Sequence, residues 1–407
     1  MVFNKRYRLT FWIFAGFFLG IIAGLLGGET LVPFARTLAN IFLRLLRMAI
    51  IPLVITSIVS AVIKVGSAHG LGRIGLQTFV YYITTSLLAI ITGQLLVNIL
   101  KPGVGAEIGL TASPENIAAV ERGLGDILMN IIPENPFRAM ADGDVLPVIF
   151  FSILFGYFVT RLKPEQEKIM SGWFSAAFDA MMKMTTFIIW TAPAGVFGII
   201  TEIVATTGFS AFKPLGFYFV IVLAGLSIHM FFTLPMILWT ITGKSPLKHY
   251  RGMIPALLTA FSTCSTIVTL PLTMRAVTEE SGGSQRAAGF VLPIGATMNM
   301  DGTALYECVA TIFIAQVYGF DLTLGMQVTI AVTAVLASIG AASIPMSGMV
   351  MMSIILSAVG LPLEGVAIIL AVDRILDMFR TTANVFSDSV GALVITRLEE
   401  NHDSQGD

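Results

Sequence analysis

Residues 371–397 carry polar side chains at spacings that place them on one face of a helix. The members of this set are Asp373, Asp377, Arg380, Asn384 and Asp388. At about 100° per residue their positions fall within an arc of roughly 80°, so a helix here has a single polar stripe. Carboxylates, a guanidinium and an amide on one face predict a chemistry of contact with ions, water or charged partners.

The remainder of this segment is apolar enough to cross a bilayer. Val385, Val390 and Leu393 occupy its other faces, and the run from Val366 to Val372 leads into it without a charge. A charged side chain at the bilayer centre costs from about 2.5 to more than 10 kcal/mol, so the stripe has to face protein, water or ions and not lipid.

Two other interpretations of the stripe have to be weighed. A helix outside the membrane would turn the polar face to water, but its other faces would then expose valine and leucine side chains. Ion pairs that only hold a bundle together would account for Arg380, but they would leave Asn384 and Asp388 without a counter-charge on the same helix. We therefore interpret the stripe as part of a binding site.

The composition of the whole chain is that of a polytopic membrane protein. Of its 407 residues, 56% are hydrophobic and 12% are charged, and the mean hydropathy is +0.86, far above that of an ordinary soluble domain. A net charge of −1 without a basic patch or tail argues against nucleic acid or an acidic partner.

Neither the cysteines nor the histidines form a recognisable catalytic or metal-binding pattern. Cys264 and Cys308 are far apart in the sequence and are interpreted as small apolar fillers. The four histidines are scattered, and the sequence contains no nucleophile elbow, phosphate loop or dinucleotide fingerprint. The sequence therefore does not predict an enzyme.

Basic clusters divide the chain into apolar spans. Lys5, Arg6 and Arg8 precede a first span at 9–26, which lacks a signal-peptide cleavage pattern, so we expect an uncleaved helix with a cytoplasmic N-terminus. Further apolar stretches lie at 31–65, 76–100, 126–158, 176–204, 217–241 and 289–317, the stretch 126–158 being broken by prolines. The basic clusters between them fall on one side, as the positive-inside rule asks, and residues 101–132 are then an outside loop.

Two apolar stretches are interrupted by small polar residues. Residues 253–274 contain STCST, with prolines near both ends, and residues 324–361 contain SIGAASIPMSG. We expect each to enter and leave the membrane on the same side, because non-helical backbone at membrane depth is tolerated only where it lines a protein cavity. Two ordinary kinked helices are the alternative.

The stretch NMDGT, residues 299–303, lies within an apolar span between these hairpins. Asn, Asp and Gly are poor residues for a helix interior but expose the carbonyl and carboxylate oxygens that a hard cation prefers. Glu307 follows in the same apolar setting, where a carboxyl is a candidate proton carrier. The alternative for Glu307 is a structural ion pair with a neighbouring basic group.

Five motifs together resemble the dicarboxylate/amino acid:cation symporter family, which includes archaeal aspartate transporters and the excitatory amino acid transporters. In order they are YYITTS, STCSTIVTLP, LPIGATMNMDGTALYE, ASIGAASIPMSG and DRILDMFRTTANVFSDS, and the resemblance covers nearly the whole chain.

The resemblance implies an all-α polytopic membrane protein with eight transmembrane helices and two re-entrant helical hairpins. It also implies a homotrimer in the cell membrane, in which a transport domain in each protomer moves like an elevator against a scaffold. The scaffold would comprise residues 1–75 and 101–210, and the transport domain residues 76–100 and 211–407.

The resemblance also implies roles for individual residues in binding an amino acid. Asp377 would bind the substrate amino group, and Arg380, held by Asp373, would bind a side-chain carboxylate. Asn384 and Thr266 would contact the α-carboxylate. Thr303 would support the side-chain carboxylate, and Thr381 belongs to the same set of substrate contacts.

Three Na⁺ sites carry over from the resemblance in the same way. One comprises Gly295, Asn299, Asn384 and Asp388. Another comprises Tyr82, Thr85, Ser86, Asn299 and Asp301. The third comprises Thr297, Ser338, Ile339 and Ala341, largely through backbone carbonyl groups. Glu307 corresponds to the glutamate that excitatory transporters use for coupling to H⁺ and K⁺.

The sequence departs from the family pattern at several points. Cys264 and Met378 stand where many members have an arginine, and Ile267 and Val268 replace part of a serine-rich hairpin tip. Asp388 favours Na⁺ as the driving ion, because proton-coupled bacterial relatives tend to have asparagine there.

The function that we expect is Na⁺-coupled uptake of glutamate or aspartate. The rivals within the family are carriers of C4 dicarboxylates or of neutral amino acids. Outside it, a membrane-embedded hydrolase would need the pair Asp373/Asp377 to share a proton, which Arg380 opposes, and a passive anion channel would not concentrate its solute.

Overall fold

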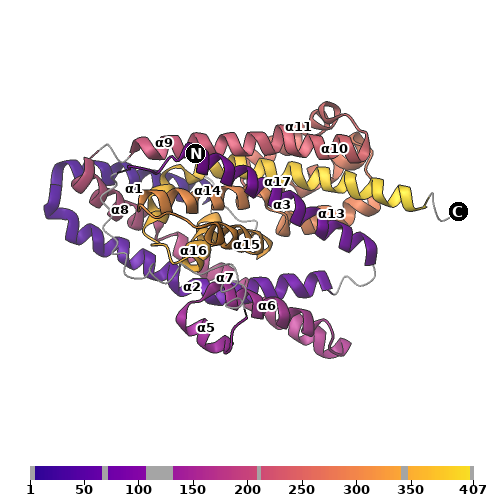
Figure 1. The fold of residues 1–407 in the computed structure, drawn as a ribbon, viewed down its shortest axis with the longest axis horizontal. Helices are drawn as coiled ribbons and strands as arrows, with labels where there is room; N and C mark the ends of the chain where they lie inside the picture. Colours follow the sequence, from indigo (N-terminus) through magenta and orange to yellow (C-terminus); the bar gives the residue numbers. More distant parts are fainter. Residues whose placement is uncertain (1–4, 67–71, 107–131, 209–211, 341–346, 404–407) are drawn as a thin grey trace.

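The computed structural model of the chain describes residues 5–66, 72–106, 132–208, 212–340 and 347–403. Within these ranges every regular element is a helix, as the composition and the resemblance predicted (Figure 1). The first half contains α1 (Lys5–Gly27), η1 (Gly28–Leu31), α2 (Val32–Gly66), α3 (Gly72–Leu100), α5 (Pro136–Asp142), α6 (Val145–Val159), α7 (Pro164–Ile189) and α8 (Ala192–Thr207).

The second half contains both interrupted stretches and the polar stripe. Its helices are α9 (Phe212–Ile228), η5 (His229–Thr233), α10 (Leu234–Thr242), α11 (Pro246–Thr263), α12 (Thr266–Arg275), η6 (Ala276–Glu280), α13 (Gln285–Met298), α14 (Asp301–Val317), α15 (Leu324–Gly340), α16 (Ser347–Ala358) and α17 (Gly365–Asp403). Most of the expected outside loop, residues 107–131, lies outside the described residues.

Helices α1, α2, α6, α7 and α8 form one packed group, in which α8 lies against α1 and α2, and α2 also packs on α6 and α7. Glycines at every fourth position of α1 allow the closest of these contacts. A Cβ added at Gly20 or Gly24 would lie 2.9 Å from a backbone oxygen of α8. Small residues at this spacing let membrane helices approach each other closely, so the glycines of α1 fix its position on α8.

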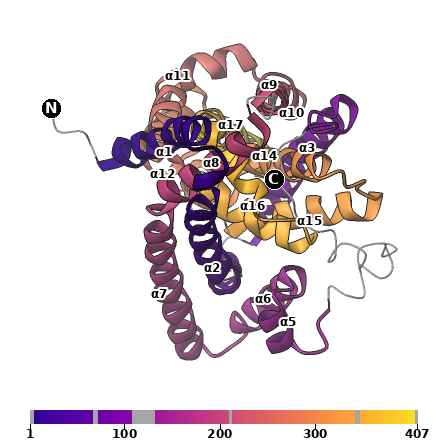
Figure 2. The ribbon, with the colours of Figure 1, turned by 90° about the vertical axis from the view of Figure 1, so that its left-hand side faces the viewer.

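Helix α17 is the centre of the second group, with α9, α10, α11, α12, α13 and α14 packed around it (Figure 2). The two groups meet mainly through α15 and α16, which pack on α2, and through the contact between α17 and α8. The division into a scaffold and a transport domain that the resemblance implies stays a prediction.

The first interrupted stretch is a hairpin and not a kinked helix. The chain leaves α11 through Cys264, at φ +51°, and enters α12 through Ser265, whose hydroxyl accepts the Val268 amide at 3.4 Å. Gly252 and Glu280 then face each other, since a Cβ on Gly252 would lie 2.9 Å from that of Glu280. Two residues so far from the tip can meet only if the arms run antiparallel.

The second interrupted stretch also forms two helices, because α15 and α16 pack on each other and on α14. The turn between them, residues 341–346, lies outside the described residues.

Two further breaks shape the interior. Between α13 and α14, Asn299 and Met300 have extended, non-helical dihedral angles, so NMDGT interrupts a long helix as expected from its residue types. Between α9 and α10, five residues form the π-helical turn η5 (His229–Thr233), a feature that is frequent at functional sites.

Several helices of the described chain have the length and apolarity needed to cross a membrane. They are Val32–Ile63, Arg73–Leu100 and Lys213–Thr242, and the pair α7–α8, bent by 44°, counts as a fourth if it is one span. The chain is therefore a multi-pass membrane protein in its helical content, and the total of eight spans is still a prediction.

Candidate functional site

The polar stripe of α17 faces the interior of the protein. Its members Asp373, Asp377, Arg380, Asn384 and Asp388 are each no more than 7% exposed. A water-exposed helix is therefore the wrong interpretation of this segment. The stripe divides into two groups with different partners, one around Asp301 and one around Arg380.

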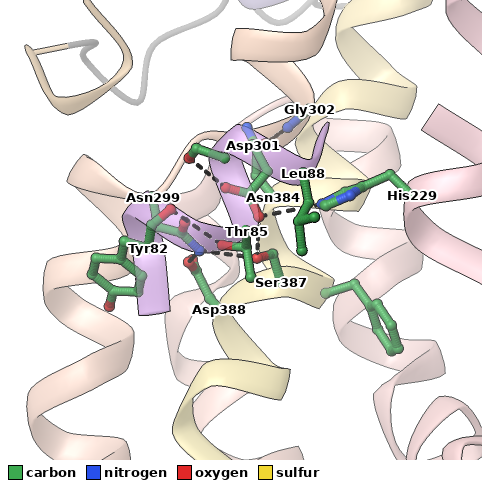
Figure 3. A network of polar contacts seen from close by, with 12 residues as sticks. Tyr82, Thr85, Leu88, His229, Asn299, Asp301, Gly302, Asn384, Ser387 and Asp388 are labelled. Carbon is green, nitrogen blue, oxygen red and sulfur yellow. Dashed lines mark hydrogen bonds and ion pairs between the residues drawn. The ribbon is translucent and has the colours of Figure 1, made fainter. Parts of the chain in front are cut away.

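The first group, which we call the oxygen cluster, consists of Ser86, Asn299, Asp301, Ser387 and Asp388. Figure 3 shows the last four of these side chains. Asp301 is at its centre, because Ser86 donates to one carboxylate oxygen at 2.6 Å and Ser387 donates to the other. As the first residue of α14, Asp301 also benefits from the positive end of the helix dipole.

Asn299 connects the two acidic side chains of the oxygen cluster. Its amide nitrogen donates to Ser387 at 3.1 Å and to Asp388 at 2.9 Å, whereas its amide oxygen has no hydrogen-bond partner among the described residues. A buried carbonyl oxygen without a donor is costly unless a cation or water binds it. Two carboxylates and this oxygen together have the donor chemistry of a hard-cation site.

Gly295 of α13 has no side chain, which lets Asp388 and Tyr82 lie close to the backbone of α13. A Cβ there would overlap the Asp388 carboxylate and would lie 2.9 Å from the Tyr82 hydroxyl. That hydroxyl donates to Val291 O at 2.6 Å, so its lone pairs stay available on the side of Asp388.

The second group, which we call the guanidinium cluster, consists of Tyr306, Asp373, Asp377 and Arg380. Arg380 is 1% exposed, and its Nη2 lies 3.2 Å from Asp373 and 2.9 Å from Asp377. The guanidinium carbon stands 4.0 Å from the centre of the Tyr306 ring, a cation–π contact. Arg380 Nε and Nη1 have no hydrogen-bond partner among the described residues.

Hairpin residues lie beside both groups. A Cβ on Gly348, at the start of α16, would overlap Arg380 Nη1, so the second hairpin covers the guanidinium at van der Waals distance. At the tip of the first hairpin, the Thr266 hydroxyl donates to Ala296 O of α13 at 2.6 Å. Described residues of both hairpins, Thr266 and Gly348, therefore lie beside the site.

The structure brings together most of the residues that the resemblance implied. Asn384 accepts from the Gly302 amide at 2.8 Å and donates to Thr303 at 3.2 Å, which ties α17 to the start of α14. Thr85 and Thr381 are buried, and Thr85 donates to Tyr81 O at 3.1 Å.

The third implied Na⁺ site is described only in part. Ser338 is buried and donates to Val335 O at 2.8 Å, whereas Thr297 is exposed and donates to Ile294 O at 2.9 Å. The side chain of Ile339 and the whole of Ala341 lie outside the described residues.

Glu307 is completely buried on α14, and neither carboxylate oxygen has a hydrogen-bond partner among the described residues. No ion pair of Glu307 is present in the described chain. Neither the role of Glu307 as a proton carrier nor the alternative of a structural partner is decided by this, and both stay predictions.

Sequence reasoning missed three residues of the site. His229 Nε2 lies 3.3 Å from Asp301, Ser387 bonds both Asn299 and Asp301, and Tyr306 stacks on Arg380. His229 carried a usable signal, because an ionisable residue within an apolar span is by default a functional candidate. Ser387 and Tyr306 are adjacent in sequence to Asp388 and Glu307, which was the only hint.

These features define a class of protein. A helical membrane protein with breaks in several spans, a pair of hairpins and a buried charged site between them has the architecture of a secondary transporter.

Comparison with known proteins gives the family. Residues 9–398 match the model of the sodium:dicarboxylate symporter family. The human and rabbit excitatory amino acid transporter 3 are each 36% identical to the chain, over 99% of it and 88% of the relative. An excitatory amino acid transporter of Caenorhabditis elegans is 36% identical over 88% of the chain and 80% of the relative. The chain belongs to the sodium:dicarboxylate symporter family, and it is a sodium-coupled transporter and not an enzyme.

Proposed function

We propose that the chain couples Na⁺ flow to the uptake of acidic amino acids, glutamate or aspartate. The observation that carries this proposal is Arg380, which is buried on α17 and keeps two nitrogen atoms without a hydrogen-bond partner among the described residues. An unsatisfied buried donor costs about 1–3 kcal/mol, more when it is charged. A ligand carboxylate removes that cost and supplies a charge-assisted hydrogen bond.

The neighbours of Arg380 provide for the other groups of an amino acid. We assign Asp377 to the substrate ammonium group, because Asp377 is 7% exposed, whereas Asp373 is completely buried. Thr303 on α14 and Asn384 on α17 are hydrogen-bonded to each other. We assign them, with Thr266 and Thr381, to the carboxylate groups of the substrate.

The oxygen cluster is the proposed place of the coupling ions. Gly295, Asn299, Asn384 and Asp388 would hold one Na⁺, and Tyr82, Thr85, Ser86, Asn299 and Asp301 another. Asn384, on α17, bonds to Gly302 and Thr303 of α14, and Asn299, just before α14, bonds to Ser387 and Asp388 of α17. An ion bound here would therefore fix the two helices that also present Thr303 and Arg380 to the substrate, which is a physical basis for coupling. Thr297, Ser338, Ile339 and Ala341 are proposed as a third site.

Glu307 is the proposed carrier of a co-transported proton, with K⁺ as a counter-ion. A buried carboxyl without a hydrogen-bonding partner is favoured in its neutral form. Loss of that proton would leave a buried negative charge beside the guanidinium cluster, where a cation such as K⁺ would compensate it.

Movement and assembly follow the family pattern in this proposal. The group around α17 would move as a transport domain against the group of α1, α2 and α5–α8, in a homotrimer embedded in the cell membrane with its N-terminus in the cytoplasm. The proposed domain limits are 1–75 and 101–210 for the scaffold, and 76–100 and 211–407 for the transport domain.

The direct test is uptake of labelled aspartate and glutamate into proteoliposomes, with Na⁺, K⁺ and pH gradients imposed one at a time. We expect concentrative uptake driven by an inward Na⁺ gradient. Uptake that never exceeds equilibrium would identify a channel and overturn the proposal. Competition by succinate or serine, stronger than by aspartate, would assign the chain to dicarboxylates or neutral amino acids.

Arg380→Cys tests the residue that carries the proposal. We expect this variant to lose uptake of acidic substrates and to gain some uptake of small neutral amino acids, because the carboxylate partner is gone while Asp377 is retained. Arg286→Cys, at an exposed arginine 3.7 Å from Glu399, is the matched control. Unchanged glutamate and aspartate uptake in Arg380→Cys would remove Arg380 from its role.

A further inference from the structure

The outer face of the first hairpin contains a groove that plays no part in the proposed transport site. Its volume is about 470 Å³, and α11 forms one wall while α12 and η6 form the other. Lys248, Arg251 and Arg275 line it, together with a single acidic residue, Glu280. All four side chains are exposed.

Two of these cations are unpaired among the described residues. Lys248 and Arg251 make no hydrogen bond or ion pair with any described residue, whereas Arg275 pairs with Glu279 at 2.7 Å on the surface of its own helix. The groove owes its depth in part to Gly252, which lines it without a side chain beside Glu280. Its cations are therefore directed toward a space between two helices and not toward an internal acid.

The polarity of the groove changes in the same direction along both walls. On α11, Lys248 and Arg251 come first, and Pro255 follows toward the tip, with the 64% exposed Leu258 three residues beyond the lining of the groove. On α12, which runs the opposite way, Leu272 precedes Arg275. Both walls are thus cationic at the base of the hairpin and apolar toward its tip.

We propose that this groove binds an anionic phospholipid. The phosphate of the headgroup would bind Lys248 and Arg251 at the base, and an acyl chain would lie along Leu258 and Leu272. Basic pockets between membrane helices on the cytoplasmic side bind anionic headgroups in this manner. A free phosphate would use the cations but not the apolar half of the groove, which is why the lipid is the better occupant.

The test measures lipid binding and not transport, so its outcome is independent of the proposed substrate. Purified protein in detergent is titrated with phosphatidylglycerol or phosphatidylcholine, and bound lipid is counted by native mass spectrometry. We expect the wild type to prefer phosphatidylglycerol. The double variant Lys248→Gln/Arg251→Gln should bind it about 30-fold more weakly, at about fivefold for each basic residue.

A matched control removes the same charge elsewhere. Lys163 and Lys168 are exposed at the start of α7, in a basic cluster on the same predicted side of the membrane. Lys163→Gln/Lys168→Gln should keep the full preference for phosphatidylglycerol. If the wild type binds both lipids equally, or if the two double variants lose binding to the same extent, the groove is not a lipid site.

Two further arms separate the occupant from a folding defect and from a free anion. Glu280→Gln removes the only acidic residue that lines the groove and should strengthen binding severalfold, a gain that misfolding cannot produce. Inorganic phosphate at the concentration of the lipid should not compete. Equal competition by phosphate would show a site for free anions and would overturn the lipid proposal.

Discussion

The oxygen cluster and the guanidinium cluster both use residues of α14 and α17, yet they balance charge in opposite ways. Around Asp301 and Asp388 the hydrogen-bond donors are mostly neutral hydroxyl and amide groups, and no lysine or arginine pairs with either carboxylate among the described residues. In the guanidinium cluster, Asp373 and Asp377 face Arg380, and Arg374 approaches Asp377 at 3.4 Å.

The difference indicates what each cluster needs from outside. Buried carboxylates whose donors are mostly neutral can be compensated by a cation, which is why the oxygen cluster is the proposed Na⁺ site. The guanidinium cluster is formally balanced once Arg374 is counted, and in the proposed function it would bind a substrate that carries both an ammonium and carboxylate groups. One helix can thereby couple two ligands, because Asn384 lies between the clusters and bonds to α14.

Asp301→Asn tests the difference between the two clusters with the largest expected effect. It removes the charge at the centre of the oxygen cluster and replaces one of the two oxygens that accept from Ser86 and Ser387 with an amide nitrogen, which cannot accept. Losing one partner of a buried charged contact costs about 3–5 kcal/mol, so we expect the Na⁺ concentration for half-maximal uptake to rise at least about 100-fold.

The control for Asp301→Asn is Asp321→Asn, which removes an exposed carboxylate next to α14. It should leave Na⁺ activation unchanged. A wild-type Na⁺ dependence in Asp301→Asn would mean that the oxygen cluster is only structural.

Gly348→Ala acts on the guanidinium cluster alone. The added methyl group would overlap Arg380 Nη1, so either the guanidinium or α16 has to move. Overpacking of this kind costs about 1–3 kcal/mol, and we expect about a tenfold rise in the KM for aspartate with little change in Na⁺ activation at saturating substrate.

Gly172→Ala is the matched control, because a Cβ at Gly172 on α7 meets nothing within 4 Å. An equal change in both glycine variants would point to a general effect on helix backbone. An unchanged KM in Gly348→Ala would mean that the second hairpin does not press on Arg380 in the substrate-binding state.

The same two clusters show how far the sequence could predict the site. The stripe was predictable because residues on one helix have fixed angular relations, and all five members are indeed buried together. The hairpin at STCST and the break at NMDGT were predictable from residue types that disfavour helix. These predictions depend on local geometry alone.

The rest of the site depends on how separate helices are placed. Ser86 is 215 positions from Asp301, and only the packing of α3 on α14 brings them together. His229 reaches Asp301 from the π-helical turn η5, which changes the register of the span at that point. Hydropathy could mark His229 as an ionisable residue within an apolar span, but neither hydropathy nor spacing identifies Asp301 as the partner of His229 or of Ser86.

Glu307→Gln tests whether the carboxyl group of Glu307, the residue after Tyr306 of the guanidinium cluster, takes part in coupling to H⁺ and K⁺. Glutamine cannot release a proton, so we expect net uptake to lose its severalfold stimulation by internal K⁺ while substrate exchange survives. Glu165→Gln, at an exposed position of α7, should retain the stimulation. If wild-type uptake depends neither on K⁺ nor on a pH gradient, the coupling assigned to Glu307 is wrong, although the substrate assignment stands.

Tyr82→Phe gives the smallest expected effect and separates ion binding from packing within the oxygen cluster. Tyr82 and Tyr81 each donate a hydroxyl hydrogen to a backbone oxygen, Val291 O at 2.6 Å and Ser387 O at 3.0 Å. Only the Tyr82 hydroxyl also lies beside Gly295 and Asp388, where a bound Na⁺ would use its lone pairs.

Each phenylalanine variant should lose about 1 kcal/mol of stability, as for a typical buried hydrogen bond, which a thermal melt measures. Only Tyr82→Phe should also raise the half-activating Na⁺ concentration, by about threefold, because it alone removes an ion ligand. If both variants shift Na⁺ activation equally, the hydroxyl of Tyr82 acts through packing of α3 on α13 and α17. The oxygen cluster would then bind its ion through Asn299, Asp301 and Asp388 without a contribution from Tyr82.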